Sequence, residues 1–159
     1  MLYLGIDPGV SGAASLIKSN GQPPLTTTIK LEHIKFKDAT EHEIAEWFRD
    51  VADTDSIVPS VKAVIERVHS MPKQGVASSF KFGQSYGFLR GLLCGLSIEF
   101  YEVTPQQWQK DMKCLTRGDK NVSKAAAHRL WPRYTNQITH ANADSLLLAR
   151  WLCQKENTI

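Results

Sequence analysis

The stretch that decides the fold opens the chain: Leu2-Tyr3-Leu4-Gly5-Ile6-Asp7-Pro8-Gly9-Val10-Ser11-Gly12. An apolar run of strand length ends on Asp7, and a Pro-Gly turn follows at once. A second apolar run, from Ala13 to Ile17, precedes the tight-turn pair Asn20-Gly21. We predict a hairpin whose buried first strand delivers Asp7 to its end. Because a buried carboxylate is costly without a partner, Asp7 either faces a metal ion or an Arg, or bonds the amides of its own turn.

The rest of the chain alternates strand and helix patterns. Val61 to Glu66 is a second short apolar strand that ends on a carboxylate. Thr40 and Glu43 form a capping box at the start of a helix, and Thr104, Pro105 and Gln107 form a similar start for another. We expect further strands at 26–34 and 97–103, and helices at 40–53, 77–95, from 104, at 123–130 and at 140–154. This order predicts an α/β fold, with a mixed sheet of about five strands flanked by helices, in a single domain over 1–159.

Composition narrows the class of protein. The chain has 159 residues and is 42% hydrophobic, which suits one globular domain with a proper core. No apolar run approaches a membrane span, and Asp7 interrupts any signal peptide. Cys94, Cys114 and Cys153 are odd in number and widely spaced, so we expect free thiols, a cytoplasmic location and no membrane partner.

Charge is segregated along the chain although the net charge is only +3. Residues 104–133 carry seven Lys and Arg residues against two acids, whereas 32–55 carry eight acids against three bases. A basic face of this kind most commonly binds phosphate backbones. A solvated, merely unbalanced surface is the alternative.

Four glycines recur at intervals of four within the predicted helix at 77–95: Gly83, Gly87, Gly91 and Gly95. Each glycine costs a helix about 1 kcal/mol, so the stripe needs a reason. A surface without side chains lets another backbone approach closely. That backbone belongs either to the sheet beneath or to a second copy of the chain.

Three acids and an imidazole form the candidate centre. Strands that end on Asp7 and Glu66 can lie side by side in a sheet. Asp144 falls in the first turns of the last predicted helix, and His140 lies four residues earlier on the same face. Clustered carboxylates require cations, and oxygen ligands select Mg²⁺ or Mn²⁺. Two such ions form the clamp that promotes phosphodiester hydrolysis, and the basic segments would hold a polyanionic substrate over it.

The chain resembles the RuvC family of Holliday-junction resolvases, specifically its phage-type members. The resemblance covers almost the whole chain and is carried by five segments in family-like order: Gly5-Ile6-Asp7-Pro8-Gly9, Ile65-Glu66-Arg67-Val68, Phe82-Gly83-Gln84-Ser85-Tyr86-Gly87, Thr104-Pro105-Gln106-Gln107-Trp108 and Ala143-Asp144-Ser145-Leu146-Leu147-Leu148-Ala149. It implies an RNase H-like fold and a homodimer built on the long helix, with Gly83, Gly87 and Gly91 at the interface. It also implies symmetric nicking of four-way DNA junctions, in recombination and repair or in debranching, with two Mg²⁺ ions per site that Mn²⁺ can replace.

The resemblance assigns residues as well. The catalytic and metal-binding positions are Asp7, Glu66 and Asp144. The family's fourth metal-site residue stands three positions before the last Asp, which is Ala141 here, so we expect His140 to replace it, with Asn142 as the alternative. His69 occupies the position of the aromatic that some members wedge into the junction; Phe80 is a substitute, although a core role is favoured for it. Candidate contacts with DNA phosphates are Lys81, Lys110, Lys113, Arg117, Lys120 and Lys124.

Other functions fit the same residues less closely. A nuclease of the same fold could act on RNA or flap DNA, since fold does not fix substrate. A junction-binding protein with weakened catalysis is a non-enzymatic alternative. Actin-like ATPases and sugar kinases also place a glycine turn early, but they need about twice this length. Trp108 is expected to pack its short helix, and Trp47 and Trp151 are expected in the core.

Overall fold

The computed structural model describes residues 1–18, 32–53, 61–67 and 75–157. One five-stranded sheet in the order β3-β2-β1-β4-β5 forms its centre. The strands are β1 (Leu2–Ile6), β2 (Ala13–Lys18), β3 (Glu32–Lys35), β4 (Val61–Glu66) and β5 (Glu99–Val103). β1, β2 and β3 pair antiparallel, whereas β1, β4 and β5 run parallel, so the sheet is mixed as the sequence predicts.

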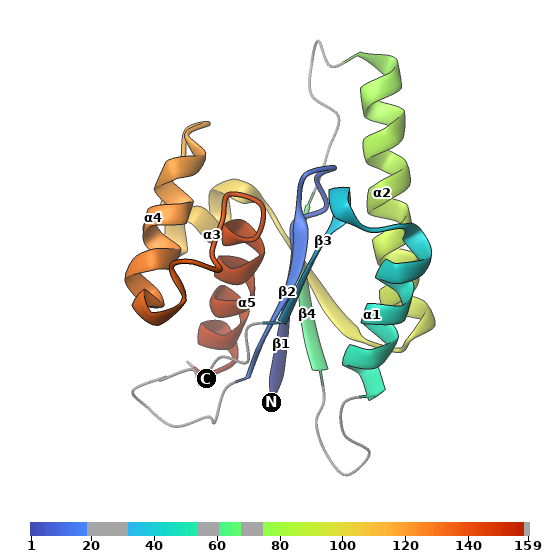
Figure 1. Ribbon diagram of the computed structural model, residues 1–159, viewed down its shortest axis with the longest axis horizontal. Helices are drawn as coiled ribbons and strands as arrows, with labels where there is room; N and C mark the ends of the chain where they lie inside the picture. Colours follow the sequence, from blue (N-terminus) through green and yellow to red (C-terminus); the bar gives the residue numbers. More distant parts are fainter. Residues whose placement is uncertain (19–31, 54–60, 68–74, 158–159) are drawn as a thin grey trace.

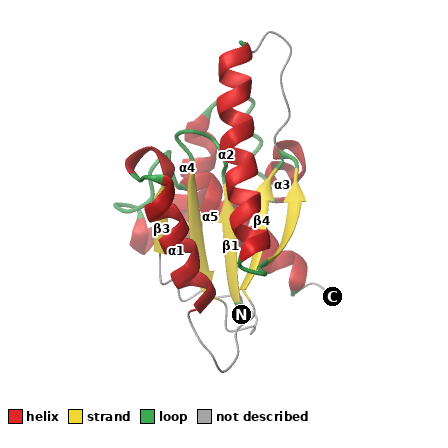
Figure 2. Cartoon of the chain, turned by 90° about the vertical axis from the view of Figure 1, so that its right-hand side faces the viewer, coloured by secondary structure: helices red, strands yellow, loops and turns green. Residues whose placement is uncertain are grey.

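Helices cover both faces of this sheet (Figure 1). They are α1 (Glu41–Asp53), α2 (Val76–Gly95), α3 (Pro105–Asp111), α4 (Lys120–Leu130) and α5 (Ala143–Glu156), with short 3₁₀ turns at Phe36–Asp38 and Pro132–Tyr134. Figure 2 shows α1 and α2 lying in front of the strands. In Figure 1, α3, α4 and α5 lie on the opposite side.

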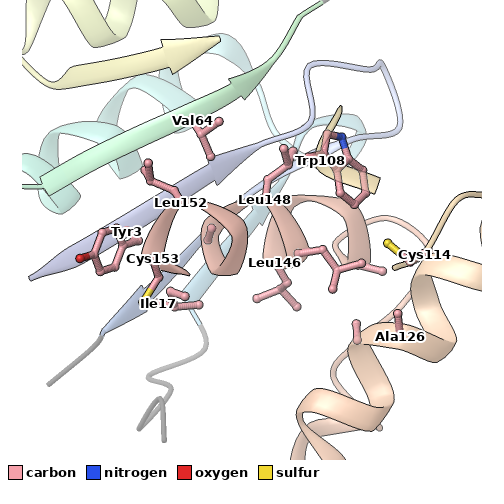
Figure 3. Packing of buried hydrophobic residues seen from close by; sticks show 14 of the residues in the cluster. Tyr3, Ile17, Val64, Trp108, Cys114, Ala126, Leu146, Leu148, Leu152 and Cys153 are labelled. Carbon is pink, nitrogen blue, oxygen red and sulfur yellow. The ribbon is translucent and has the colours of Figure 1, made fainter. Parts of the chain in front are cut away.

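The alternation of side chains along β1 divides the core in two. Leu2, Leu4 and Ile6 pack in one cluster with residues of α1 and α2. Tyr3 points the other way and packs with α5, together with Val64 of β4 (Figure 3). The first strand is therefore buried on both faces, as its continuous apolar run predicts.

Several predicted boundaries need correction. The last helix begins at Ala143 rather than at His140, because residues 140–142 form a turn closed by the amide of Ala143 on the carbonyl of Thr139. The helix predicted at 123–130 already begins at Lys120, because Asp119 caps it by accepting from the amide of Asn121. The strand predicted at 97–103 begins at Glu99, after a left-handed Ser97. Residues 26–31 of another predicted strand lie outside the described residues.

The two predicted helix starts behave differently. At α1 the capping box is complete: the Thr40 amide donates to the Glu43 carboxylate, and the Glu43 amide donates to the Thr40 hydroxyl. At α3 the Thr104 hydroxyl accepts from the Gln107 amide. The Gln107 side chain donates to Asp111 instead of returning to the cap, so the second half of that predicted box is wrong.

The glycine stripe of α2 faces away from the sheet. A Cβ atom added at Gly83, Gly87, Gly91 or Gly95 would meet no atom within 4 Å. Of the two partners that the sequence left open, the protein's own sheet is therefore excluded.

Phe80 on the same helix is 67% exposed, so the core role favoured for it is wrong. Trp108, in contrast, is fully buried, as its predicted packing role requires.

Candidate active site

The two strand-end carboxylates lie on neighbouring parallel strands. Ile6 of β1 pairs with Ile65 of β4, so Asp7 and Glu66 follow at the same edge of the sheet. Side chains alternate along a strand, and Tyr3 and Val64 pack on the α5 face. Asp7 and Glu66 share the parity of these residues, which places both carboxylates on the face covered by α5.

A close contact between β1 and α5 brings the third acid to the same edge. A Cβ atom added at Gly5 would lie 2.0 Å from the Ser145 carbonyl oxygen and 2.4 Å from the Ala149 nitrogen, so only glycine permits this approach. The Ser145 hydroxyl donates to the Asn142 carbonyl and lies 2.6 Å from the Ser15 hydroxyl of β2. The first turn of α5, which carries Asp144, is therefore fixed against the end of β1.

The turn after β1 shapes the surroundings of Asp7. The Gly9 amide donates to Asp7 Oδ1 at 3.1 Å, which is the turn bond that the sequence left as one alternative. A Cβ atom at Gly12 would lie 2.2 Å from the Asp7 carbonyl oxygen, so the chain returns directly beneath the carboxylate. One amide does not saturate a carboxylate, and Asp7 retains capacity for a further partner.

Glu66 and Asp144 each have a neighbouring donor that the sequence reading missed. The Trp108 indole of α3 donates to Glu66 Oε2 at 2.7 Å. The buried Ser123 hydroxyl of α4 donates to the Lys120 carbonyl at 3.3 Å, and its proximity to Asp144 lowers the pKa of that carboxyl. Both residues are buried on short helices, and no local sequence pattern shows which carboxylate each one meets. Their contacts with the acids become visible only when α3 and α4 are placed beside the ends of the strands.

The three carboxylates are electrostatically coupled. The pKa of Asp7 is raised from 3.8 to about 6, chiefly by burial and then by the charge of Asp144, while the Gly9 amide opposes the rise. The pKa of Glu66 is raised from 4.5 to about 7, chiefly by burial and then by the charge of Asp7, while the Trp108 bond opposes the rise. Burial also raises the pKa of Asp144. Groups whose pKa values are raised by burial and by each other favour a cationic partner.

The predicted basic residues differ in their relation to the three acids. Lys120, the first residue of α4, lowers the pKa of Asp7, Glu66 and Asp144 through its charge. Lys110, Lys113 and Arg117 are exposed on α3 and on the connector to α4, Lys124 is half-buried on α4, and Lys81 is exposed on α2. Lys113 and Arg117 have left-handed backbones, with φ of 55° and 48°. His69 lies outside the described residues.

The turn before α5 separates the two candidates for the fourth ligand. Asn142 is fully buried, and its side chain accepts from the Thr139 amide at 2.7 Å and donates to the Gln137 carbonyl at 3.0 Å. Its amide group is therefore occupied in holding the turn. His140 is exposed, and its charge lowers the pKa of Asp144, so its imidazole lies within electrostatic reach of that carboxylate.

The oxygen ligands that these acids offer suit a divalent ion such as Mg²⁺. Asp144 Oδ1 is buried without a hydrogen-bond partner among the described residues, and three carboxylates supply hard oxygen ligands. Within the same part of the chain, no three His, Cys, Asp or Glu side chains form a ready metal site. The residues present fit such an ion by chemistry, through an orphaned buried oxygen and through coupled acids.

These features define a class of fold. A mixed sheet in the order β3-β2-β1-β4-β5, with helices on both faces and acids at the ends of β1 and β4, is RNase H-like. Comparison with solved structures narrows this to a RuvC-like fold. The Thermus thermophilus RuvC structure matches with a TM-score of 0.64 and 16% identity, over 99% of this chain and 98% of that chain. T. thermophilus RuvC in complex with Holliday junction substrate matches over the same shares with a TM-score of 0.66 and 16% identity. No family model matches the sequence, and no curated protein matches it significantly.

The described residues include no helix long and apolar enough to cross a membrane. All three cysteines are free, with Cys94 exposed and Cys114 and Cys153 buried, which confirms the expected thiols.

Proposed function

We propose that this protein is a metal-dependent endonuclease that resolves four-way and other branched DNA junctions by paired phosphodiester hydrolysis. One observation carries the proposal: Asp7, Glu66 and Asp144 converge at one edge of a sheet with a RuvC-like fold. Their coupled pKa values support this convergence, because each acid is shifted by burial and by a neighbouring charge. Such shifts cluster at functional sites.

In this proposal Asp7, Glu66 and Asp144 hold two Mg²⁺ or Mn²⁺ ions, and His140 completes the site. When bound, such ions supply an activated water and stabilise the leaving oxygen. The chain's own residues hold the ligands: the Gly9 amide donates to Asp7, the Trp108 indole donates to Glu66, and the close approach of α5 to Gly5 places Asp144. The charge of Lys120 lowers the pKa of all three acids, and in this proposal it neutralises a DNA phosphate bound beside them.

DNA would lie across the basic side chains near this edge. Lys110, Lys113, Arg117, Lys120 and Lys124 belong to consecutive elements, α3 to α4, and Lys81 lies on α2. Their contacts with phosphates would provide affinity without base specificity. The fold match to RuvC solved with Holliday junction substrate supports a branched substrate for this chain.

A homodimer would provide the second active site that paired nicking needs. The outward face of α2 is the candidate interface. Val76 and Phe80 are 87% and 67% exposed. Gly83, Gly87 and Gly91 continue the same helical face, with open space above each. Apolar side chains beside bare backbone suit the close approach of a partner helix.

Substrate class can be tested with matched DNAs that share one set of arm sequences. We would incubate four-way, three-way, flap and linear duplexes, and an RNA–DNA hybrid, with Mg²⁺, and map the products at nucleotide resolution. Paired symmetric nicks confined to branched DNA are expected. Asp144→Asn should abolish nicking while junction binding persists, because the basic contacts remain.

The other outcomes separate the alternatives. Cleavage of the hybrid or the flap in preference to four-way DNA would identify an RNase H-like nuclease with another substrate. Tight junction binding without cleavage in either Mg²⁺ or Mn²⁺ would identify a binding protein with weakened catalysis. Nicking by Asp144→Asn at the wild-type rate would remove Asp144 from the site.

A further inference from the structure

We infer that Trp108 is a positioning residue: its indole N–H fixes the Glu66 carboxylate for metal binding. This inference rests on the proposed function, in which Glu66 is a metal ligand. The Trp108 Nε1 atom lies 2.7 Å from Glu66 Oε2, a short distance typical of a hydrogen bond to a charged acceptor.

The indole itself is firmly held. Trp108 is fully buried and belongs to the cluster that α5 forms with the sheet, where Figure 3 shows it beyond Leu148. Its backbone amide donates to the carbonyl of Thr104, the cap residue of α3. Because packing fixes the ring and the cap fixes the helix, the direction of the N–H is determined before any ligand binds.

The consequence for Glu66 follows from donor and acceptor numbers. An indole has one donor and no acceptor, whereas a carboxylate has two oxygens. The bond therefore occupies Oε2 and orients the carboxylate, while the indole leaves Oε1 for another partner. Without the indole donor, the Glu66 carboxylate at the end of β4 could rotate. A metal ion would then have to order the carboxylate on binding, which would lower the affinity for the ion.

Packing alone would also place a tryptophan in this core, so the test must separate shape from hydrogen bonding. Benzothienylalanine keeps the bicyclic shape of tryptophan and replaces N–H by sulfur. We would incorporate it at position 108 and, as a matched control, at position 151. The Trp151 indole also donates to a carboxylate, Asp111 Oδ2 at 2.8 Å, but away from the three acids. Trp108→Phe provides a second, genetically simple variant.

The primary readout is Mn²⁺ binding to the full chain by titration calorimetry, which needs no substrate. Ligand-orienting bonds are worth roughly 10- to 100-fold in metal affinity. We expect the analogue at 108 to weaken Mn²⁺ binding by about tenfold or more, and the analogue at 151 to leave it unchanged. Cleavage should then show a raised Mg²⁺ requirement at 108, with unaltered junction affinity.

The outcomes distinguish this inference from the proposed function. Equal Mn²⁺ affinity for wild type and the folded analogue at 108 would overturn the positioning role and leave the nuclease proposal intact. Weakened Mn²⁺ binding in a protein that cuts no branched DNA would support the role and overturn the proposed substrate. A wild-type protein that binds no Mn²⁺ would overturn both. An equal loss at positions 108 and 151 would show a general effect of the analogue and overturn the specific role.

Discussion

Asp7 shows how the candidate site trades stability for chemistry. Its pKa is raised to about 6, chiefly by burial and then by the charge of Asp144. In metal-free protein above pH 7, Asp7 is therefore ionised in surroundings that favour its neutral form, which destabilises the fold. The difference of about two pKa units from an ordinary Asp corresponds to about 3 kcal/mol.

Asp7→Asn should therefore abolish nicking and, at pH 8 without metal, raise the free energy of unfolding by up to about 3 kcal/mol. Chemical denaturation checks the second result. Asp111→Asn is the matched control: the Asp111 carboxylate accepts from Trp151 and Gln107, which hold its pKa below the ordinary value, so its neutralisation should destabilise the protein. If Asp7→Asn instead destabilised the protein, the ionised Asp7 would not be a source of instability in the fold.

His140 is the second residue with a directional prediction. His140→Ala should lose most cleavage and demand more Mg²⁺, whereas His140→Asp should retain cleavage, because a carboxylate is an acceptable hard ligand there. Initial rates across an Mg²⁺ series provide the measurement. Normal cleavage by His140→Ala would leave His140 as a surface residue of the turn, and Asn142, whose side chain is occupied in that turn, could not replace it.

At the scale of elements, the packing of β1 against α5 places one acid relative to the other two. Gly5→Ala puts a methyl group 2.0 Å from the Ser145 carbonyl, a backbone atom that cannot rotate away. We expect a loss of about 3 kcal/mol or more, at the upper end of overpacking costs, together with lost cleavage as Asp144 shifts. Thermal unfolding would show it. Gly83→Ala, in open helical surface, is the control and should stabilise the folded monomer slightly; equal effects would contradict the close contact.

The exposed face of α2 leads to a prediction about assembly. Gly87→Leu adds a large side chain where nothing lies within 4 Å, so the monomer should fold normally. If α2 packs on a second copy, the leucine should separate the two chains, and sedimentation should show a folded monomer with poor paired nicking. A folded dimer would place the interface elsewhere. Unfolding would contradict the open position of Gly87.

These elements also show what sequence can predict. The strands ending on Asp7 and Glu66 were predictable because short apolar runs bounded by turn residues are local signals, and the capping box at Thr40 is local too. The Trp108 and Ser123 contacts were not, because each joins residues more than 20 positions apart. The start of α5 was misplaced by three residues, since the turn from His140 to Asn142 imitates a helical turn. The direction of the glycine stripe was undecidable, because glycines themselves have no polar or apolar face.

At the scale of the whole molecule, the site sets the pH dependence of stability. The folded protein binds more protons than the unfolded chain wherever pH lies between the ordinary pKa values of 3.8 and 4.5 and the raised values of about 6 and 7 for Asp7 and Glu66. Stability of the metal-free protein therefore falls as pH rises from about 4 to about 7 through these groups, and their contribution is flat above that. The double variant Asp7→Asn, Glu66→Gln should flatten this slope.

Divalent ions should stabilise the protein most at high pH, where the ionised acids destabilise the metal-free form. An ion that binds only the folded protein stabilises it by mass action, and it competes with the protons that the raised pKa values retain. Mg²⁺ should therefore raise the melting temperature clearly at pH 8 and little at pH 5, where Asp7 and Glu66 are protonated. Differential scanning calorimetry with Mg²⁺, and with Na⁺ at matched ionic strength, would measure this. A shift equal at both pH values, or one that persists in the double variant, would mean that the ion binds elsewhere, since only a site built on these two carboxylates couples its occupancy to their protons.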